Sequence, residues 1–258
     1  MPTVTLLEKA YGSQRPETFE PIFSSLCGGF KVRIRVVDAT NRGWIRLEVS
    51  GEDVTIALRF LDQKFGLAPV SLDKLRKFSV MRGKILSSVE DKSELQVDIG
   101  VFSPKTCDAV IPLQRLQAQL ANEEVLTFQQ LTELFCLYEK LPLSVKIVNN
   151  IDVQKEKVEA ELSEAQLSQT THWIRSCLDR LIVLGAPFSE VEDMLRRSKH
   201  SRDVVKVEQL GLLEHAVVCK LGTDAVGLIP KLGPLLPRAE LSPFCPNKIR
   251  KFVKRSFL

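Results

Sequence analysis

The sequence predicts an α+β protein made of two or three small domains. Its 258 residues are more than one small domain needs, and 44% of them are hydrophobic while 26% are charged, as in ordinary folded proteins. Segments with apolar residues at every second position alternate with segments of helical spacing, which indicates mixed strands and helices. The tripeptide Asp-Ala-Val also occurs twice, each time after a strand-like segment that ends in glycine.

The first 75 residues show the order β-α-β-β-α. Residues 31–38 and 44–50 alternate cleanly and predict a hairpin with one buried face. Residues 3–10 predict a strand before it, residues 17–29 a helix ended by a glycine pair, and residues 51–66 an amphipathic helix ended by glycine. This order predicts a ferredoxin-like domain over residues 1–75.

The repeated phrase lies in two segments, 84–100 and 206–222, that align without gaps. Each segment predicts a strand, a turn, a second strand and a glycine turn, followed by a third strand. On this pattern Ala225–Ile229 of the second copy is expected to form a strand, as Ala109–Leu113 does in the first copy. A true repeat and a coincidence of two short meanders explain the second copy equally well.

The first copy continues into a longer series of landmarks. In chain order they are Gly83-Lys84-Ile85, Val97–Gly100, Ala109–Leu113, Val145–Asp152 and Leu162-Ser163. The series resembles the five-stranded OB-type RNA-binding barrel that is repeated in a bacterial small-subunit ribosomal protein and found in translation and RNA-decay factors. The resemblance implies a barrel over residues 80–163.

Two features depart from that barrel family. The approach to the second strand lacks the usual base-stacking aromatics, and only Phe102 is near it. The segment between the third and fourth strands is long and predicts a helical insertion at 114–140. Residues 80–235 also resemble an uncharacterised, cytosolic archaeal protein family of unknown function, which implies no activity.

Residues 164–258 predict helices followed by a small β unit and a basic tail. A capping box at Ser163 and Gln166 predicts a long helix that reaches Gly185. Strands are expected from Val204 to about Pro230, and the proline-rich remainder is expected to be mostly irregular.

Sequence motifs of enzymes and cofactor sites are missing. The chain has no P-loop, no dinucleotide-binding glycine motif, no H-E-x-x-H and no Gly-x-Ser-x-Gly. Its six cysteines are scattered, which favours reduced, buried thiols. Asp108 and Asp224 recur in the repeated phrase, and a turn-bonding role is favoured over a catalytic one. We therefore expect no catalysis, no cofactor and no metal. No apolar run or leader pattern predicts a membrane span or secretion, so a cytoplasmic location is expected.

The net charge of +4 is mild, but its distribution suggests binding surfaces. The polar face of the N-terminal hairpin places cations beside an aromatic, as base stacking with phosphate contact requires. The favoured alternative is a solvated sheet face on which a neighbouring domain covers Trp44. The barrel rim and the basic tail are the other candidates. The candidate RNA-binding residues are Lys31, Arg33, Arg35, Trp44, Arg46, Arg82, Lys84, Lys92, Phe102, Lys105, Arg115, Lys248, Arg250, Lys251, Lys254 and Arg255.

These observations predict a non-catalytic RNA-binding factor that acts in translation or RNA processing. Its partner would be single-stranded or ribosomal RNA, held mainly through the backbone. The alternative is a protein–protein adaptor subunit of a large ribonucleoprotein or transcription complex. The missing strand aromatics favour that alternative.

Overall fold

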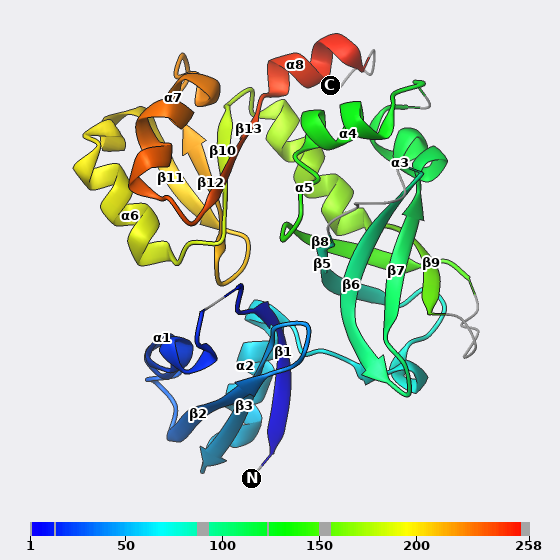
Figure 1. Ribbon diagram of the computed structural model, residues 1–258, viewed down its shortest axis with the longest axis vertical. Helices are drawn as coiled ribbons and strands as arrows, with labels where there is room; N and C mark the ends of the chain where they lie inside the picture. The colour runs from blue at the N-terminus through cyan, green and yellow to red at the C-terminus, as the bar shows by residue number, and fades with distance from the viewer. Residues whose placement is uncertain (1, 13, 87–92, 123, 150–155, 254–258) are drawn as a thin grey trace. The chain divides into compact units, whose positions relative to one another are not determined.

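The computed structural model describes residues 2–12, 14–86, 93–122, 124–149 and 156–253. Figure 1 shows a mixed α+β chain, and it divides into two compact units. The first unit contains residues 1–75 and 99–107, and the second contains residues 76–98 and 108–258. In the described residues, no helix is long and apolar enough to cross a membrane.

The N-terminal region has the predicted order of elements. They are β1 (Thr3–Lys9), the 3₁₀ helix η1 (Pro16–Phe19), α1 (Glu20–Leu26), β2 (Val32–Ala39), β3 (Trp44–Gly51), α2 (Val54–Phe65), β4 (Val70–Ser71) and the 3₁₀ helix η2 (Leu72–Lys74). The first three strands form an antiparallel sheet in the order β1-β3-β2. Helices α1 and α2 contribute Phe23 and Phe65, whose rings meet edge to face with centroids 5.7 Å apart, to its core. The ferredoxin-like resemblance of this region stays a prediction.

The central strands close into the predicted five-stranded barrel. The strands are β5 (Val80–Ile85), β6 (Glu94–Ser103), β7 (Cys107–Pro112), β8 (Pro142–Ile147) and β9 (Lys157–Leu162). They are adjacent in the order β6-β5-β8-β9-β7, and β6 pairs with β7 to close the ring. Strands β7 and β9 are parallel, whereas β5 is antiparallel to β6 and β8. The architecture is consistent with an OB-type barrel.

Two helices, α3 (Leu113–Leu120) and α4 (Phe128–Phe135), join β7 to β8, as the sequence predicts. Thr127 caps α4 by accepting a hydrogen bond from the Gln130 backbone N–H, and the Gln130 side chain accepts one from the Thr127 N–H. After the barrel, Ser163 caps α5 (Glu164–Arg175). This helix ends at Arg175, so the predicted continuation to Gly185 is wrong.

A four-stranded antiparallel sheet follows, with the order β11-β12-β10-β13. Its elements are β10 (Arg180–Leu184), α6 (Phe188–Arg197), η3 (His200–Asp203), β11 (Val204–Gln209), β12 (Glu214–Cys219), α7 (Ala225–Leu232), η4 (Gly233–Leu235), β13 (Glu240–Phe244) and α8 (Pro246–Phe252). Helices α6 and α7 lie on one face of this sheet (Figure 1), where Val191, Met194 and Leu228 join its buried core. The expected β unit with strands from Val204 is present, but its expected irregular end is wrong, because the chain continues through α7, β13 and α8 and completes a βαββαβ unit.

The second copy of the repeated phrase does not fold like the first. Val217 and its neighbours form a strand as expected, but Ala225–Ile229 belongs to α7 rather than to a strand. Asp224 explains the difference, because its carboxylate accepts hydrogen bonds from the N–H groups of Val226 and Gly227 and so caps a helix. Asp108 lies inside β7 instead. The repeat hypothesis is wrong for the third strand.

Candidate nucleic-acid interface

The polar face of the N-terminal hairpin is largely engaged within the protein. Arg46 forms a bidentate ion pair with Asp38, and this hydrogen bonding lowers the pKa of Asp38. Lys31 pairs with Glu52 at 2.8 Å, although both side chains stay exposed. Arg33 and Arg35 are exposed on β2.

Trp44 does not stack on a ligand in this structure, because its side chain is fully buried. Leu7 and Ala68 cover it with Val70, and the Lys9 ammonium lies 4.3 Å from the ring centroid. The chain after α2 turns back across this end of the sheet, where the Leu7 N–H bonds the Gly66 carbonyl. The assignment of Trp44 to an RNA-binding face is therefore wrong, and the alternative of a covered ring is the one that the burial supports.

The barrel candidates separate into buried and exposed residues. Lys84 is 1% exposed and pairs with Glu214 at 2.7 Å, so its assignment to the rim is wrong. Arg115 pairs with Glu159 and Glu161, which neutralise its charge. Arg82 and Lys105 are exposed, and Phe102 is partly buried.

The outer face of β6, a usual ligand surface of OB-type barrels, is covered. Residues Val97–Val101 are all buried. Gly100 has a φ of +74°, and a Cβ placed there would lie 2.8 Å from the Ala68 Cβ and 2.9 Å from a Leu7 methyl. The strand therefore contacts protein where a nucleic acid would otherwise bind.

The basic tail is partly helical rather than irregular. Lys248, Arg250 and Lys251 are exposed on α8. The candidates Lys92, Lys254 and Arg255 lie outside the described residues.

Sequence reasoning missed an exposed aromatic residue, Phe78, at the entry to β5. Its side chain is 62% exposed. The ammonium groups of Lys77 and Lys146 lie 5.0 Å and 5.7 Å from its ring centroid. Arg76 and Arg82 are exposed nearby in the chain. We call these five residues the Phe78 cluster.

Phe78 is displayed by a turn that does not suit a phenylalanine. The Ser79 N–H donates to the Arg76 carbonyl at 3.0 Å, and the Ser79 hydroxyl donates to the same oxygen at 2.6 Å. Phe78, the third residue of this turn, has a φ of +68°. That is the type II position where Gly or Asn is usual, and a bulky residue there costs roughly 1–3 kcal/mol.

Strand pairing fixes the rest of the cluster. Val80, 58% exposed, lies directly opposite Lys146 in the β5–β8 register, so both side chains share one face with Arg82. The Phe78 N–H bonds the Ile147 carbonyl at 2.8 Å and holds the turn against β8. Lys146 also pairs with Glu161 at 3.1 Å. The basic-aromatic run Arg76-Lys77-Phe78 was the available sequence signal, but it lay between the two predicted domains.

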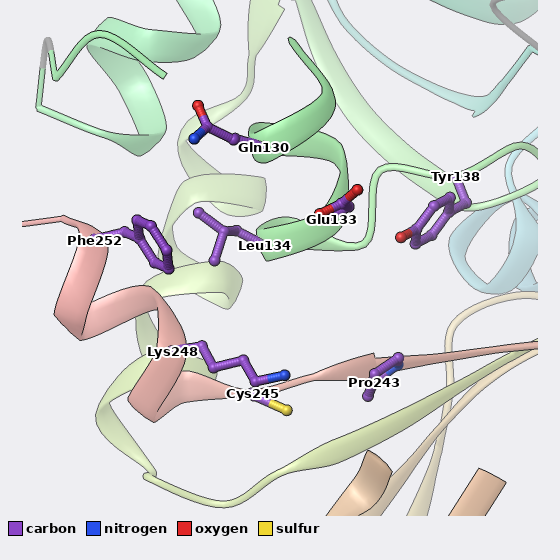
Figure 2. Close-up of a pocket in the computed structure, with 8 residues that line it drawn as sticks. All are labelled: Gln130, Glu133, Leu134, Tyr138, Pro243, Cys245, Lys248 and Phe252. Atoms are coloured by element: carbon purple, nitrogen blue, oxygen red, sulfur yellow. The ribbon is translucent and has the colours of Figure 1, made fainter. Parts of the chain in front are cut away.

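A pocket of about 320 Å³ lies between α4 and α8 (Figure 2). Its lining residues are Gln130, Glu133, Leu134, Tyr138, Pro243, Cys245, Lys248 and Phe252. Burial raises the pKa of the Cys245 thiol to about 12, and the Asp179 carboxylate adds to the shift. The thiol is therefore protonated at neutral pH, and the pocket lacks an activated sulfur nucleophile. Within the described residues, no group of three or more His, Cys, Asp or Glu side chains could hold a metal ion.

Three family models match the chain in order. The DUF2110 N-terminal domain matches residues 3–71, the DUF2110 central domain residues 77–174 and the DUF2110 C-terminal domain residues 178–243. No curated protein matches the chain. Among solved structures, the intact alpha subunit of aIF2 from Pyrococcus abyssi aligns over 66% of this chain and 97% of its own length, with 9% identity and a TM-score of 0.26. On the three matched domains, the chain belongs to the DUF2110 family.

Proposed function

We propose that the chain is a non-catalytic protein that binds single-stranded RNA through the Phe78 cluster, and that it acts in the cytoplasm in translation or RNA processing. The supporting observation is one exposed ring surrounded by cations on the barrel surface. Stacking of a base on an aromatic ring contributes about 1–3 kcal/mol, and it needs an unpaired base. A single strand therefore fits this site better than a duplex.

The backbone geometry supports the same proposal. A glycine at position 78 would relieve the turn, so packing and turn formation give no reason for a phenylalanine there. The ring is neither part of the core nor needed to close the turn. Strained residues of this kind gather at binding sites, where the ligand contact offsets the local cost.

Charge removal tests the proposal directly. The variant Lys77→Ser/Arg82→Ser removes two cations of the cluster, and Arg33→Ser/Arg35→Ser is the matched control that removes two cations from β2. We expect the first variant to weaken binding of labelled oligouridine and to flatten the plot of log affinity against log salt by about 0.7 for each phosphate that the protein no longer neutralises. The β2 variant should follow the wild type.

Equal losses of affinity in both variants would mean that binding is diffuse and would contradict the assignment to the Phe78 cluster. Absence of any binding at physiological salt would contradict the RNA function itself. The adaptor function would then be the better account, because many barrel cations are neutralised by ion pairs such as Arg115–Glu159.

A further inference from the structure

In the described residues, each edge strand of the two open sheets other than β11 carries a feature that hinders pairing with another strand. An open edge presents unpaired N–H and C=O groups that another strand can bind. On β2 the outward N–H of Val36 donates to the Glu20 carboxylate at 2.9 Å. On β13, Pro243 has no N–H to offer. The β1 edge is occupied where the Ala68 N–H bonds the Thr5 carbonyl at 2.8 Å.

Strand β11 offers its backbone groups outward. The Leu210 N–H bonds the Glu214 carbonyl at 2.9 Å, and in the same register Glu208 and Lys206 face Ala216 and Val218 of β12. Along an antiparallel pair, the residues that bond the neighbouring strand alternate with residues that do not. The residues that alternate with Lys206, Glu208 and Leu210 therefore point their N–H and C=O groups away from the sheet. These residues are Val207 and Gln209, and their backbone groups have no partner in the part of the chain that the structure describes.

The side chains of β11 are complementary to a second copy of the same strand. In an antiparallel pair centred on Val207, the two Val207 residues exchange both backbone hydrogen bonds. Lys206 of each copy then lies opposite Glu208 of the other, in the closely spaced positions where cross-strand charges interact best. Within one chain Lys206 and Glu208 already lie 3.0 Å apart, so both side chains stand on the same face.

We propose that two copies of this chain associate through β11, which joins their C-terminal sheets into one continuous antiparallel sheet. This inference is independent of the RNA function. A register shift between Val204 and Lys206 ends the regular strand, so the symmetric pairing is confined to residues 206–208. A contact this short is small for a stable interface, so the dimer is weak and depends on protein concentration.

Proline tests the backbone contact. Val207→Pro removes an N–H that makes no bond within the described residues, so it blocks the partner strand without removing a bond of the sheet. Val207→Ala is its control, because it loses the same packing against the core but keeps the N–H. By sedimentation equilibrium over a concentration series, we expect wild type and Val207→Ala to dimerise and Val207→Pro to stay monomeric with an unchanged circular dichroism spectrum.

Charge reversal tests the register. Lys206→Glu places like charges opposite each other in the dimer and should raise its dissociation constant at least about tenfold. Lys220→Glu, an exposed lysine beyond the end of β12, makes the same change in net charge and should have no effect. Glu208 is left unchanged because it also faces the buried Arg180 at 3.7 Å. A monomeric wild type at all concentrations, or a Val207→Pro variant that dimerises as well as Val207→Ala, would overturn the proposal.

Discussion

The buried ion pair between Lys84 of β5 and Glu214 of β12 predicts a large and asymmetric response to mutation. The two charged groups lie 2.7 Å apart, and their side chains are 2% and 0% exposed. Asp98, directly opposite Lys84 on β6, is also buried. Lys84→Met therefore leaves two carboxylates buried without this ammonium, and breaking a buried pair in this way costs about 3–5 kcal/mol.

Glu214→Gln should cost less than Lys84→Met, because the buried Asp98 still lies directly opposite Lys84 in the strand register. The double variant should lose about 1–3 kcal/mol less stability than the sum of the two single losses. The reason is that the second change removes a charge that the first change left uncompensated. The free energy of unfolding measured in urea, with the transition of the second unit followed by circular dichroism, gives all three values.

The control is Arg196→Ala, which breaks an ion pair of 2.8 Å with Asp193 in the same unit, where both side chains are at least half exposed. Its cost should stay below about 1 kcal/mol. The reasoning is refuted if Lys84→Met costs no more than this control, or if the two single changes add without coupling.

Three further predictions concern thiol reactivity, stability at alkaline pH and helix capping. Of the six cysteines, only Cys177 is not buried. One thiol should therefore react quickly with a disulfide reagent, and the other five should react only after unfolding. Several fast-reacting thiols would contradict the burial of the five. Burial raises the pKa of Cys136 and Cys245 to about 12 and of Cys219 to about 11, above the ordinary value of 9. As the pH rises, the thiols of the unfolded chain lose their protons before those of the folded chain, so the free energy of unfolding should fall between about pH 9 and 12. A urea midpoint that stays constant over this range would refute this prediction. Asp224→Ala should cost about 1 kcal/mol through loss of the α7 cap, and an unchanged urea midpoint would contradict the capping role.

The resemblance of five ordered landmarks predicted the barrel, but not what covers it. The two helices of the insertion follow from the helical spacing of their leucines and Phe135. The assignment of Lys84 to the rim was wrong because its partner Glu214 is 130 positions away in the sequence, and no local pattern shows that the two residues meet. An exposed and a covered Trp44 both stayed open, because the sequence does not show that the chain around Ala68 folds over the ring.

The errors at the repeated phrase and at Phe78 have a related cause. The same tripeptide forms a strand after Cys107 and a helix after Thr223, because only Asp224 is placed to cap free N–H groups. The site at Phe78 depends on a positive φ, and a phenylalanine gives no sequence signal for that conformation. The residue that carries the proposed function was therefore found from its backbone geometry and its exposure.

The central claim is that Phe78 is present for binding rather than for folding, and the variant Phe78→Gly separates these two roles. Phe78→Gly relieves the turn strain of roughly 1–3 kcal/mol, but the greater freedom of glycine in the unfolded chain costs about 0.5–1 kcal/mol. We therefore expect the free energy of unfolding to stay equal or rise slightly. Leu221→Ala, which shortens another exposed apolar side chain in the same unit, is the control.

The deciding measurement is the affinity of Phe78→Gly for single-stranded oligouridine at fixed salt, beside its urea stability. The account predicts an affinity lower by about 5- to 150-fold, the equivalent of removing one base from an aromatic stack, with stability retained and with Leu221→Ala unchanged. Wild-type affinity in Phe78→Gly, or a fall in affinity that merely follows a fall in stability, would contradict it.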